Sequence, residues 1–225
     1  MANDAEKELA ARAALEYIHD RQVVGLGSGS TSTIAIHLIG KRVRQGLKIR
    51  GVPTSIASRE LANQVGIPLT TFDEVQEIDV TIDGADEFDP RLNLIKGGGG
   101  AMLREKIVAS ATKQLVIVTD SSKQVELLGE FPLPLEVIGF AEPLVAKKVS
   151  GLGARVVRRQ DSSGNLYLTD EGHHIFDCHF ERISDPPTLA RILSDMPGIV
   201  EHGLFIGMAS VVLMAKDGKV VEFRP

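Results

Sequence analysis

The spacing of apolar positions switches repeatedly in the first half of the chain, and each switch predicts a change between helix and strand. Apolar residues recur every three or four positions in four segments, as in amphipathic helices: residues 5–19, 31–39, 55–65 and 101–112. A short segment with apolar residues follows each predicted helix and indicates a strand: residues 22–26, 48–52, 78–82 and 115–119. This alternation predicts a doubly wound α/β layer, and the unbroken last run is typical of a parallel strand covered on both faces.

A different pattern begins near Gly129. Pro132 and Pro134 interrupt an apolar run, and the rhythm of strands and helices stops there. The following segments indicate a small α+β unit, with helices at residues 142–152 and 185–196 and strands at residues 135–138, on both sides of 162–165 and at 173–179. The last two apolar runs, 209–214 and 219–223, form a predicted hairpin that returns to the first sheet. We therefore expect one main domain, residues 1–129 and 206–225, with a smaller α+β domain, residues 130–205, inserted into it.

Composition narrows the classes of protein that fit. The chain has 225 residues and is 43% hydrophobic, which is enough to bury the core of one large domain or two modest ones. Its net charge of -5, without a run of lysines and arginines, argues against a nucleic-acid partner. No segment is long and apolar enough to span a bilayer, and the N-terminus has mixed charge, so we expect a soluble, unprocessed protein with no membrane partner. Cys178 is the only cysteine, which fits a reducing compartment, and we expect the cytoplasm.

Residues 25–31 (GLGSGST) form a glycine-rich turn between a predicted strand and a predicted helix. The G-x-G-x-G spacing differs from the dinucleotide fingerprint, although Arg50 on the next strand leaves a phosphorylated dinucleotide open, and the Walker lysine is absent. Backbone amides, three hydroxyl groups and the positive end of the helix favour the binding of one anion. The hydroxyl groups belong to Ser28, Ser30 and Thr31, and a plain tight turn is the alternative.

Acidic and basic side chains follow the third predicted strand. Asp83 and Asp86 come directly after it, and the carboxyl ends of strands are where open α/β sheets bind ligands. An EF-hand is excluded by the spacing, whereas a divalent cation bound by these two residues and Asp89, or a plain acidic turn, stays open. Lys96 then precedes four glycines, and Glu105 follows on the next predicted helix. Glycines let a backbone approach a ligand closely, and a flexible linker is the alternative.

A histidine-rich segment, residues 173–179, has a pattern that disfavours a metal site. Strand alternation places its candidate ligands on opposite faces, with His174, Phe176 and Cys178 on one and His173, Ile175, Asp177 and His179 on the other.

Seven motifs occur in an order that is more specific than any one of them. They are residues 25–31, DGADE at 83–87, KGGG at 96–99, REK at 104–106, DSSK at 120–123, FPLPLEV at 131–137 and PGIV at 197–200. With this set the chain resembles the ribose-5-phosphate isomerases of the A type over nearly its whole length. It departs from that pattern at Ser28, where many relatives have threonine, and at Gly100, where some have alanine.

The resemblance implies an enzyme of the non-oxidative pentose phosphate pathway that interconverts D-ribose 5-phosphate and D-ribulose 5-phosphate without a metal or an organic cofactor. It implies a Rossmann-like catalytic domain with a smaller inserted domain, and a homodimer or homotetramer. The implied catalytic residues are Glu105, Asp83, Asp86 and Lys96. The implied substrate-binding residues are Ser28, Gly29, Ser30, Thr31, Asp83, Gly84, Ala85, Asp86, Lys96, Gly97, Gly98, Gly99 and Lys123.

Aldose–ketose isomerisation moves a proton between C2 and C1 through an enediolate, so it needs a base that reaches both carbons and a positive charge near the oxyanion. We predict that Glu105 is the base, that Lys96 stabilises the oxyanion or orients the substrate, and that Asp83 and Asp86 handle hydroxyl protons. Lys123 contacts the phosphate or a sugar hydroxyl in this prediction, and a solvated surface lysine is the alternative.

Two rival functions stay open at this point. One is an amino-sugar phosphate deaminase, because residues 171–176 weakly resemble the catalytic histidine loop of such enzymes. A non-catalytic sugar-phosphate sensor is the other, since it would keep the anion-binding loop and need no base at Glu105.

Overall fold

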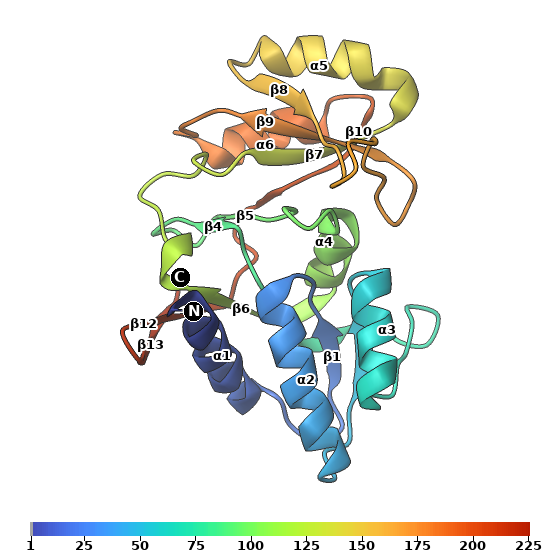
Figure 1. Cartoon of the computed structure of the whole chain (residues 1–225), viewed down its shortest axis with the longest axis vertical. Coiled ribbons are helices and arrows are strands. Elements are labelled where there is room, and N and C mark those ends of the chain that lie inside the picture. The colour runs from blue at the N-terminus through green and yellow to red at the C-terminus, as the bar shows by residue number, and fades with distance from the viewer. Residues whose placement is uncertain (1) are drawn as a thin grey trace. The chain divides into compact units, whose positions relative to one another are not determined.

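A computed structural model of the chain describes residues 2–225 (Figure 1). The chain packs as two compact units. Unit 1 comprises the chain up to Ala85 together with Arg104–Gln124 and Met208–Pro225, and unit 2 comprises Asp86–Leu103 and Val125–Gly207.

Unit 1 is built on a six-stranded sheet with the order β13-β12-β6-β3-β1-β2. The strands are β1 (Val23–Leu26), β2 (Arg50–Pro53), β3 (Ile78–Asp83), β6 (Thr112–Asp120), β12 (Val211–Lys216) and β13 (Lys219–Phe223). Every neighbouring pair is parallel except β12 and β13, which form the predicted C-terminal hairpin. β12 pairs with β6, which confirms that the hairpin returns to the first sheet. Because the other strands are parallel, the carboxyl ends of β1, β3 and β6 lie along one edge.

Four α-helices belong wholly or mainly to unit 1: α1 (Ala2–Ala14), α2 (Ser30–Arg44), α3 (Ile56–Val65) and α4 (Met102–Ser110). Figure 1 shows α2 between α1 and α3, and the apolar faces of these helices pack against the sheet in a core around Ala10, Ile36 and Val80. Val108 of α4 packs in a separate cluster with Val23, Val52 and Ile78. The short helix η1 (Leu15–Tyr17) ends α1, and η2 (Ser121–Lys123) follows β6. The predicted α/β class is confirmed.

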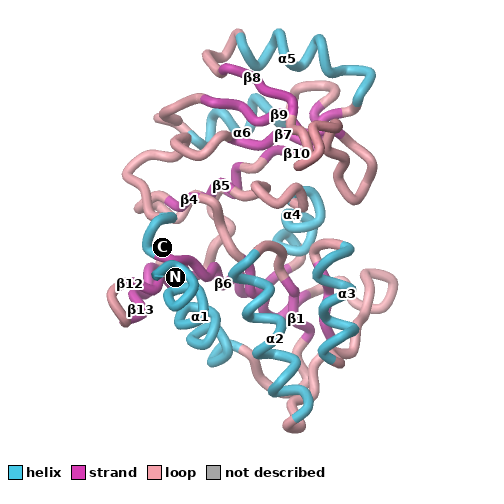
Figure 2. Tube along the Cα trace, viewed as in Figure 1, coloured by secondary structure: helices cyan, strands magenta, loops and turns pink. Residues whose placement is uncertain are grey.

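Unit 2 contains two small sheets, seen in Figure 2. The four-stranded sheet is antiparallel, with the order β10-β7-β9-β8, and its strands are β7 (Leu133–Val137), β8 (Arg155–Arg158), β9 (His174–His179) and β10 (Ile199–His202). The three-stranded sheet has the order β11-β5-β4, with β4 (Glu87–Phe88), β5 (Leu94–Ile95) and β11 (Leu204–Phe205). The helices are η3 (Gly139–Ala141), α5 (Glu142–Ser150) and α6 (Pro186–Ser194).

The core of unit 2 follows from the alternation of side chains along β7 and β9. Leu135 and Val137 of β7 pack with Phe176 and Cys178 of β9 and with Val145 of α5. Burial of Cys178 raises the pKa of its thiol to about 12, so the sulfur is an unreactive part of this core. The intervening residues, including Asp177, point to the other face, as the alternation predicts.

The structure contains strands that the sequence pattern does not predict. β4, β5 and β11 have two residues each, which is too short for any apolar period to register. Because β5 pairs with β11, residues 86–103 pack in unit 2 together with 125–207. The expected inserted domain, residues 130–205, lies within this larger unit.

Candidate active site

The residues predicted to form the site are divided between the two units. Unit 1 contains the residues of the first glycine loop and of two other segments: Ser28, Gly29, Ser30, Thr31, Asp83, Gly84, Ala85, Glu105 and Lys123. Unit 2 contains Asp86, Lys96, Gly97, Gly98 and Gly99.

The first glycine loop is tied to the end of β3. The amide of Gly27 donates to the carbonyl of Ile82 at 3.0 Å, and the amide of Ser28 donates to Asp83 Oδ1 at 3.1 Å. A Cβ atom on Gly27 would lie 2.2 Å from that same carboxylate oxygen, so no larger residue fits without a shift of the carboxylate. The glycine is therefore required by close approach of β1 and β3.

The helix α2 begins directly after this loop. Gly29 is its N-cap, with φ +91°, and no side chain caps the helix. The amides at the start of an α-helix have no acceptors within the helix, and they favour an anion. Ser30 is exposed and Thr31 is buried, with 8% of its surface accessible. The Ser28 hydroxyl differs from the other two, because it bonds to Thr54 Oγ1 and Ser55 Oγ, both at 2.8 Å.

Asp83 ends β3 and is buried, with 1% of its surface accessible. Its Oδ1 atom accepts hydrogen bonds from the amide of Ser28, from Ser32 Oγ at 3.1 Å and from the amide of Gly84 at 2.8 Å. Three donors on one oxygen hold the carboxylate in one orientation. Gly84 and Ala85 follow as half-buried residues of the turn.

Glu105 and Lys123 come from the other two segments of unit 1. Glu105 lies in the first turn of α4, where a carboxylate is favoured by the helix dipole, and it is 5% exposed. Lys123 is half-buried in η2, directly after β6. Asp120 caps this turn by accepting from the amide of Ser122 at 2.9 Å, and Glu6 of α1 accepts from the amide of Ser121 at 3.0 Å.

In unit 2, Asp86 is joined to the second glycine loop. Its amide donates to the carbonyl of Ile95 at 2.8 Å, and its Oδ2 atom accepts from the amide of Gly98 at 2.7 Å. Lys96 is 3% exposed, and its amide donates to the carbonyl of Gly203 at 2.9 Å. The Lys96 ammonium lies 5.5 Å from the centroid of the Phe205 ring, a geometry that suits a cation–π interaction.

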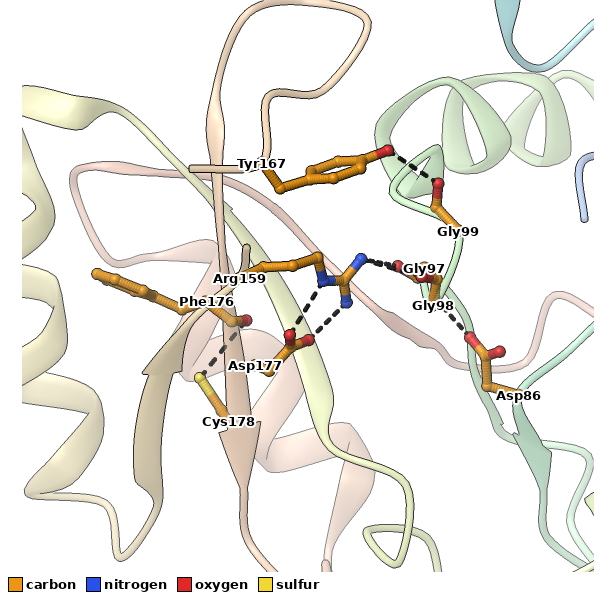
Figure 3. Close-up of polar contacts among 9 residues, drawn as sticks. All are labelled: Asp86, Gly97, Gly98, Gly99, Arg159, Tyr167, Phe176, Asp177 and Cys178. Carbon is orange, nitrogen blue, oxygen red and sulfur yellow. Dashed lines mark hydrogen bonds and ion pairs between the residues drawn. The ribbon is translucent and has the colours of Figure 1, made fainter. Parts of the chain in front are cut away.

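Two residues that the sequence does not single out contact the glycine loop. Arg159 donates to the carbonyls of Gly97 and Gly98, and Tyr167 donates to the carbonyl of Gly99 (Figure 3). Both come from a segment more than 60 residues further along the chain. The only signal for them in the sequence is indirect, because four glycines without side chains need support from elsewhere.

The two segments considered as metal sites from the sequence make other contacts in the structure. Within residues 2–225, no group of three or more His, Cys, Asp or Glu side chains is arranged to hold a metal ion. Asp89 organises a turn by accepting from the amides of Arg91 and Asn93, both at 2.9 Å. His173 Nδ1 contacts Glu136 Oε1 at 2.9 Å, and His174 contacts Glu142. No helix in the described part of the chain is long and apolar enough to cross a bilayer.

Comparison with known proteins identifies the family. Residues 50–219 match the family model of ribose 5-phosphate isomerase A (phosphoriboisomerase A). A ribose-5-phosphate isomerase A from Nitrobacter hamburgensis is 50% identical over an alignment that covers 100% of both chains. The chain belongs to the ribose 5-phosphate isomerase A family. A second relative of that name, from Bradyrhizobium diazoefficiens, is 49% identical, with 100% of this chain and 98% of the relative covered.

Solved structures of ribose 5-phosphate isomerases agree with this assignment. One, of a D-ribose-5-phosphate isomerase in complex with phospho-erythronic acid, superposes with a TM-score of 0.97 at 37% identity and 100% coverage of both chains. Another, of the ribose 5-phosphate isomerase A from Methanocaldococcus jannaschii, has a TM-score of 0.94 at 38% identity, with 99% of each chain covered. The family resemblance and the Rossmann-like fold class are confirmed.

Proposed function

We propose that the protein is an aldose–ketose isomerase that interconverts D-ribose 5-phosphate and D-ribulose 5-phosphate in the non-oxidative pentose phosphate pathway. The observation that carries the proposal is the burial of three ionisable side chains in the family's motifs: Asp83, Lys96 and Glu105 are 1%, 3% and 5% exposed. Burying such groups is costly and seldom occurs without a structural or catalytic reason. Membership of the family supplies the reaction.

Glu105 is the base in this proposal. Isomerisation removes a proton from one carbon and returns it to its neighbour, so one carboxylate near both carbons can perform both transfers. The first turn of α4 fixes the backbone from which Glu105 projects. Lys96 supplies the positive charge that stabilises the enediolate oxygen. Its burial strengthens the electrostatic interaction with that oxygen, since charges are screened less in a low dielectric. No metal or organic cofactor is needed for these steps.

Asp83 and Asp86 handle the hydroxyl protons during ring opening and enediol formation. Asp83 is oriented by the hydrogen bonds that its Oδ1 atom accepts from the amides of Ser28 and Gly84, and its carboxylate is the group assigned to the substrate hydroxyls. Asp86 is half-buried and is oriented by its bond to the Gly98 amide. Gly84 and Ala85, which lie between the two aspartates, form the backbone of the same substrate-binding turn.

The amides of the second glycine loop bind substrate oxygens in this proposal. In a trans peptide the carbonyl and the following amide point in opposite directions. Because the carbonyl of Gly98 points to Arg159, the amide of Gly99 points away from it, as the amide of Gly98 points away from Arg159 towards Asp86. Gly98 and Gly99 are exposed, so a ligand can reach this backbone. Gly97 is buried and sets the start of the loop.

The phosphate binds at the start of α2. The loop from Ser28 to Thr31 supplies the amides and the Ser30 and Thr31 hydroxyls, while the Ser28 hydroxyl supports the loop from behind. Lys123 contacts the phosphate or a sugar hydroxyl. The solved relative in complex with phospho-erythronic acid, a phosphorylated sugar acid, supports a phosphate site in the family.

A direct assay tests the proposal. Purified protein is incubated with ribose 5-phosphate, and ribulose 5-phosphate formation is followed; turnover is expected, whereas unphosphorylated ribose should be a very poor substrate. Ammonia release from an amino-sugar phosphate would instead favour a deaminase, a rival that is weakened because His173 is engaged by Glu136. Binding of ribose 5-phosphate without turnover would favour a sensor.

We also propose that the protein is a cytoplasmic homodimer or homotetramer. Family membership supports the assembly, and a single buried cysteine suits a reducing compartment. Light scattering on the purified chain gives the number of subunits.

A further inference from the structure

The second glycine loop is held by side chains that the isomerase chemistry does not itself use. We propose that Arg159, with Tyr167 and Asp177, is a positioning group that fixes the direction of the Gly97–Gly99 peptides and thereby aligns Asp86 and the Gly99 amide for the substrate. This inference rests on the proposed function, because it assumes that this loop faces the sugar.

All three nitrogen atoms of the Arg159 guanidinium group donate to the loop or to one carboxylate (Figure 3). Nη1 donates to the carbonyl of Gly97 at 2.9 Å and to that of Gly98 at 3.1 Å. Nε donates to Asp177 Oδ2 at 3.0 Å, and Nη2 donates to Asp177 Oδ1. This bidentate ion pair fixes the plane of the guanidinium group, and the fixed plane directs Nη1 towards the loop.

Tyr167 extends the same contact by one residue. Its hydroxyl donates to the carbonyl of Gly99 at 3.1 Å, and its ring centroid lies 5.8 Å from the Arg159 guanidinium carbon. Burial raises the pKa of Tyr167, so the phenol keeps the proton that it donates. Three consecutive carbonyls are thus held from one side by two side chains.

The positions of these side chains are fixed by the β-structure of unit 2. The amide of Arg159 donates to the carbonyl of Ile175 at 2.8 Å, and the amide of Tyr167 donates to the carbonyl of Arg159 at 3.1 Å. Asp177 lies on β9 between Phe176 and Cys178, whose side chains enter the core, so its carboxylate leaves the opposite face. Asp177 of the clamp therefore lies on a paired strand, whose position is more precise than that of a loop, while Arg159 directly follows β8 and Tyr167 is tied to it by a backbone hydrogen bond.

Glycine peptides need such support more than any others. Without Cβ atoms, four consecutive glycines have access to a wide range of backbone angles, and ordering them is entropically costly. If the carbonyls of Gly97 and Gly98 turned, the Gly98 amide would leave Asp86, and the Gly99 amide would turn with them. Misplacement of reacting groups by about 1 Å can lower a rate about 10²-fold. The clamp acts on the rate through other residues and does not touch the substrate.

Two substitutions test the clamp. Arg159→Lys keeps the charge but loses the fork, and Tyr167→Phe removes only the bond to Gly99 while it keeps the ring. Arg155→Lys on exposed β8 and Tyr17→Phe in unit 1 are the matched controls. We expect Arg159→Lys to lower kcat for ribose 5-phosphate about 10²-fold and Tyr167→Phe about 5-fold, with KM changed less than 3-fold, in line with the effect of misplacement on rates. Both controls should match the wild type.

A second measurement does not depend on catalysis. Millisecond hydrogen–deuterium exchange in a peptide spanning residues 96–101 should become faster in both variants, while exchange in β7 stays unchanged. Unchanged exchange and kcat in Tyr167→Phe and Arg159→Lys would overturn the inference, as would a loss of kcat that tracks global unfolding in β7. If the wild type fails to isomerise ribose 5-phosphate, the proposed function fails, whereas the exchange result still decides whether the clamp holds the loop.

Discussion

The two glycine loops of this isomerase are rigid for different reasons. The first, residues 25–31, joins β1 to α2, and it is fixed within unit 1 by the carbonyl of Ile82 and the carboxylate of Asp83 at the end of β3 and by the hydroxyls that follow β2. The second, residues 96–100, follows a strand of only two residues, and besides the bonds of the Lys96 and Gly100 amides to backbone carbonyls it is held by the side chains of Arg159 and Tyr167 from a distant part of the sequence. A loop at a strand–helix junction derives its shape from the fold, whereas a loop after a minimal strand derives it from long-range side chains.

The glycines themselves reflect this difference. A Cβ on Gly27 would meet both Asp83 Oδ1 and the carbonyl of Ile82, at 2.2 and 2.6 Å, so the backbones of two strands leave no room. A Cβ on Gly98 would meet the Asp86 carboxylate at 2.7 Å, which is a side chain that can move. Gly99 has open space around it. Substitutions in the first loop should therefore lower the stability of the fold, whereas substitutions in the second loop should mainly lower activity.

The largest effect is expected from Glu105→Gln, on the helix that follows the second loop. The change keeps the shape and removes the base, so turnover should fall about 10²- to 10⁴-fold, while a phosphorylated analogue still binds. Solvent deuterium should no longer enter C1 or C2, as measured by NMR. The control is Glu60→Gln on the exposed face of α3. Near-normal turnover with deuterium exchange would move the role of base to another residue, with Asp83 the next candidate.

Gly27→Ala should have the next largest effect, because it tests whether the fold fixes the first loop. Overpacking of this kind costs about 1–3 kcal/mol of folding free energy, and it displaces the carboxylate of Asp83, which is proposed to handle hydroxyl protons. Urea unfolding should show a lower midpoint together with a loss of activity. A stable and active variant would show that the strands can separate at this point, and the two loops would then not differ as described.

Gly98→Ala should reduce activity with little loss of stability. The new methyl group displaces the Asp86 carboxylate, so we expect kcat to fall about 10-fold, which corresponds to about 1.4 kcal/mol at the transition state. Gly99→Ala is the matched control, since its methyl group enters open space. Comparing kcat and the urea midpoint of the pair separates displacement of Asp86 from loss of loop flexibility. Equal losses in both variants would contradict the role of Asp86.

Much of the first loop could be predicted from the sequence, and little of the second. The strand 22–26 and the helix that follows it are confirmed as β1 and α2, because apolar periods and a glycine-rich turn are local signals. The predicted helix 55–65 is confirmed as α3, and Ser55 is its N-cap, since the Ser55 hydroxyl accepts from the amide of Ser58 at 3.0 Å.

The clamp on the second loop has no comparable signal. In the sequence, Arg159 is an ordinary basic residue beside Arg158. Asp177 is a candidate metal ligand in a histidine-rich predicted strand. Only the pairing of β9 with β8, and the bond from Arg159 to Ile175, reveals that the two side chains share one face. The sequence also gives no sign that the Ser28 hydroxyl is occupied by Thr54 and Ser55, because residues so far apart in the chain meet only after folding.

Thr31→Val should have a moderate effect confined to binding. It removes one hydroxyl from the start of α2, and a hydrogen bond to a charged group contributes about 1.5–3 kcal/mol, so KM for ribose 5-phosphate should rise about 10-fold or more with kcat little changed. Thr33→Val is the control in the next turn, because its hydroxyl bonds to the carbonyl of Gly29 and is not available to a ligand. An unchanged KM in Thr31→Val would argue against phosphate binding at this loop.

The smallest effect, none at all, is expected from removal of metal ions. The chemistry proposed here places the positive charge on Lys96, so exhaustive treatment with EDTA should leave turnover unchanged. Loss of turnover that Mg²⁺ or Mn²⁺ restores would make Asp83 and Asp86 metal ligands, and the roles assigned to both loops would have to be revised.

The hydroxyl of Ser55 serves two structures at once. It accepts from the amide of Ser58, in the first turn of α3, and it also accepts from the hydroxyl of Ser28 in the first glycine loop, at 2.8 Å. A helix terminus and the first glycine loop therefore depend on the same oxygen atom. A substitution at residue 55 that leaves α3 intact would still remove a support of the Ser28 hydroxyl, so in the proposed mode of binding it would weaken the phosphate site from a position that does not touch the ligand.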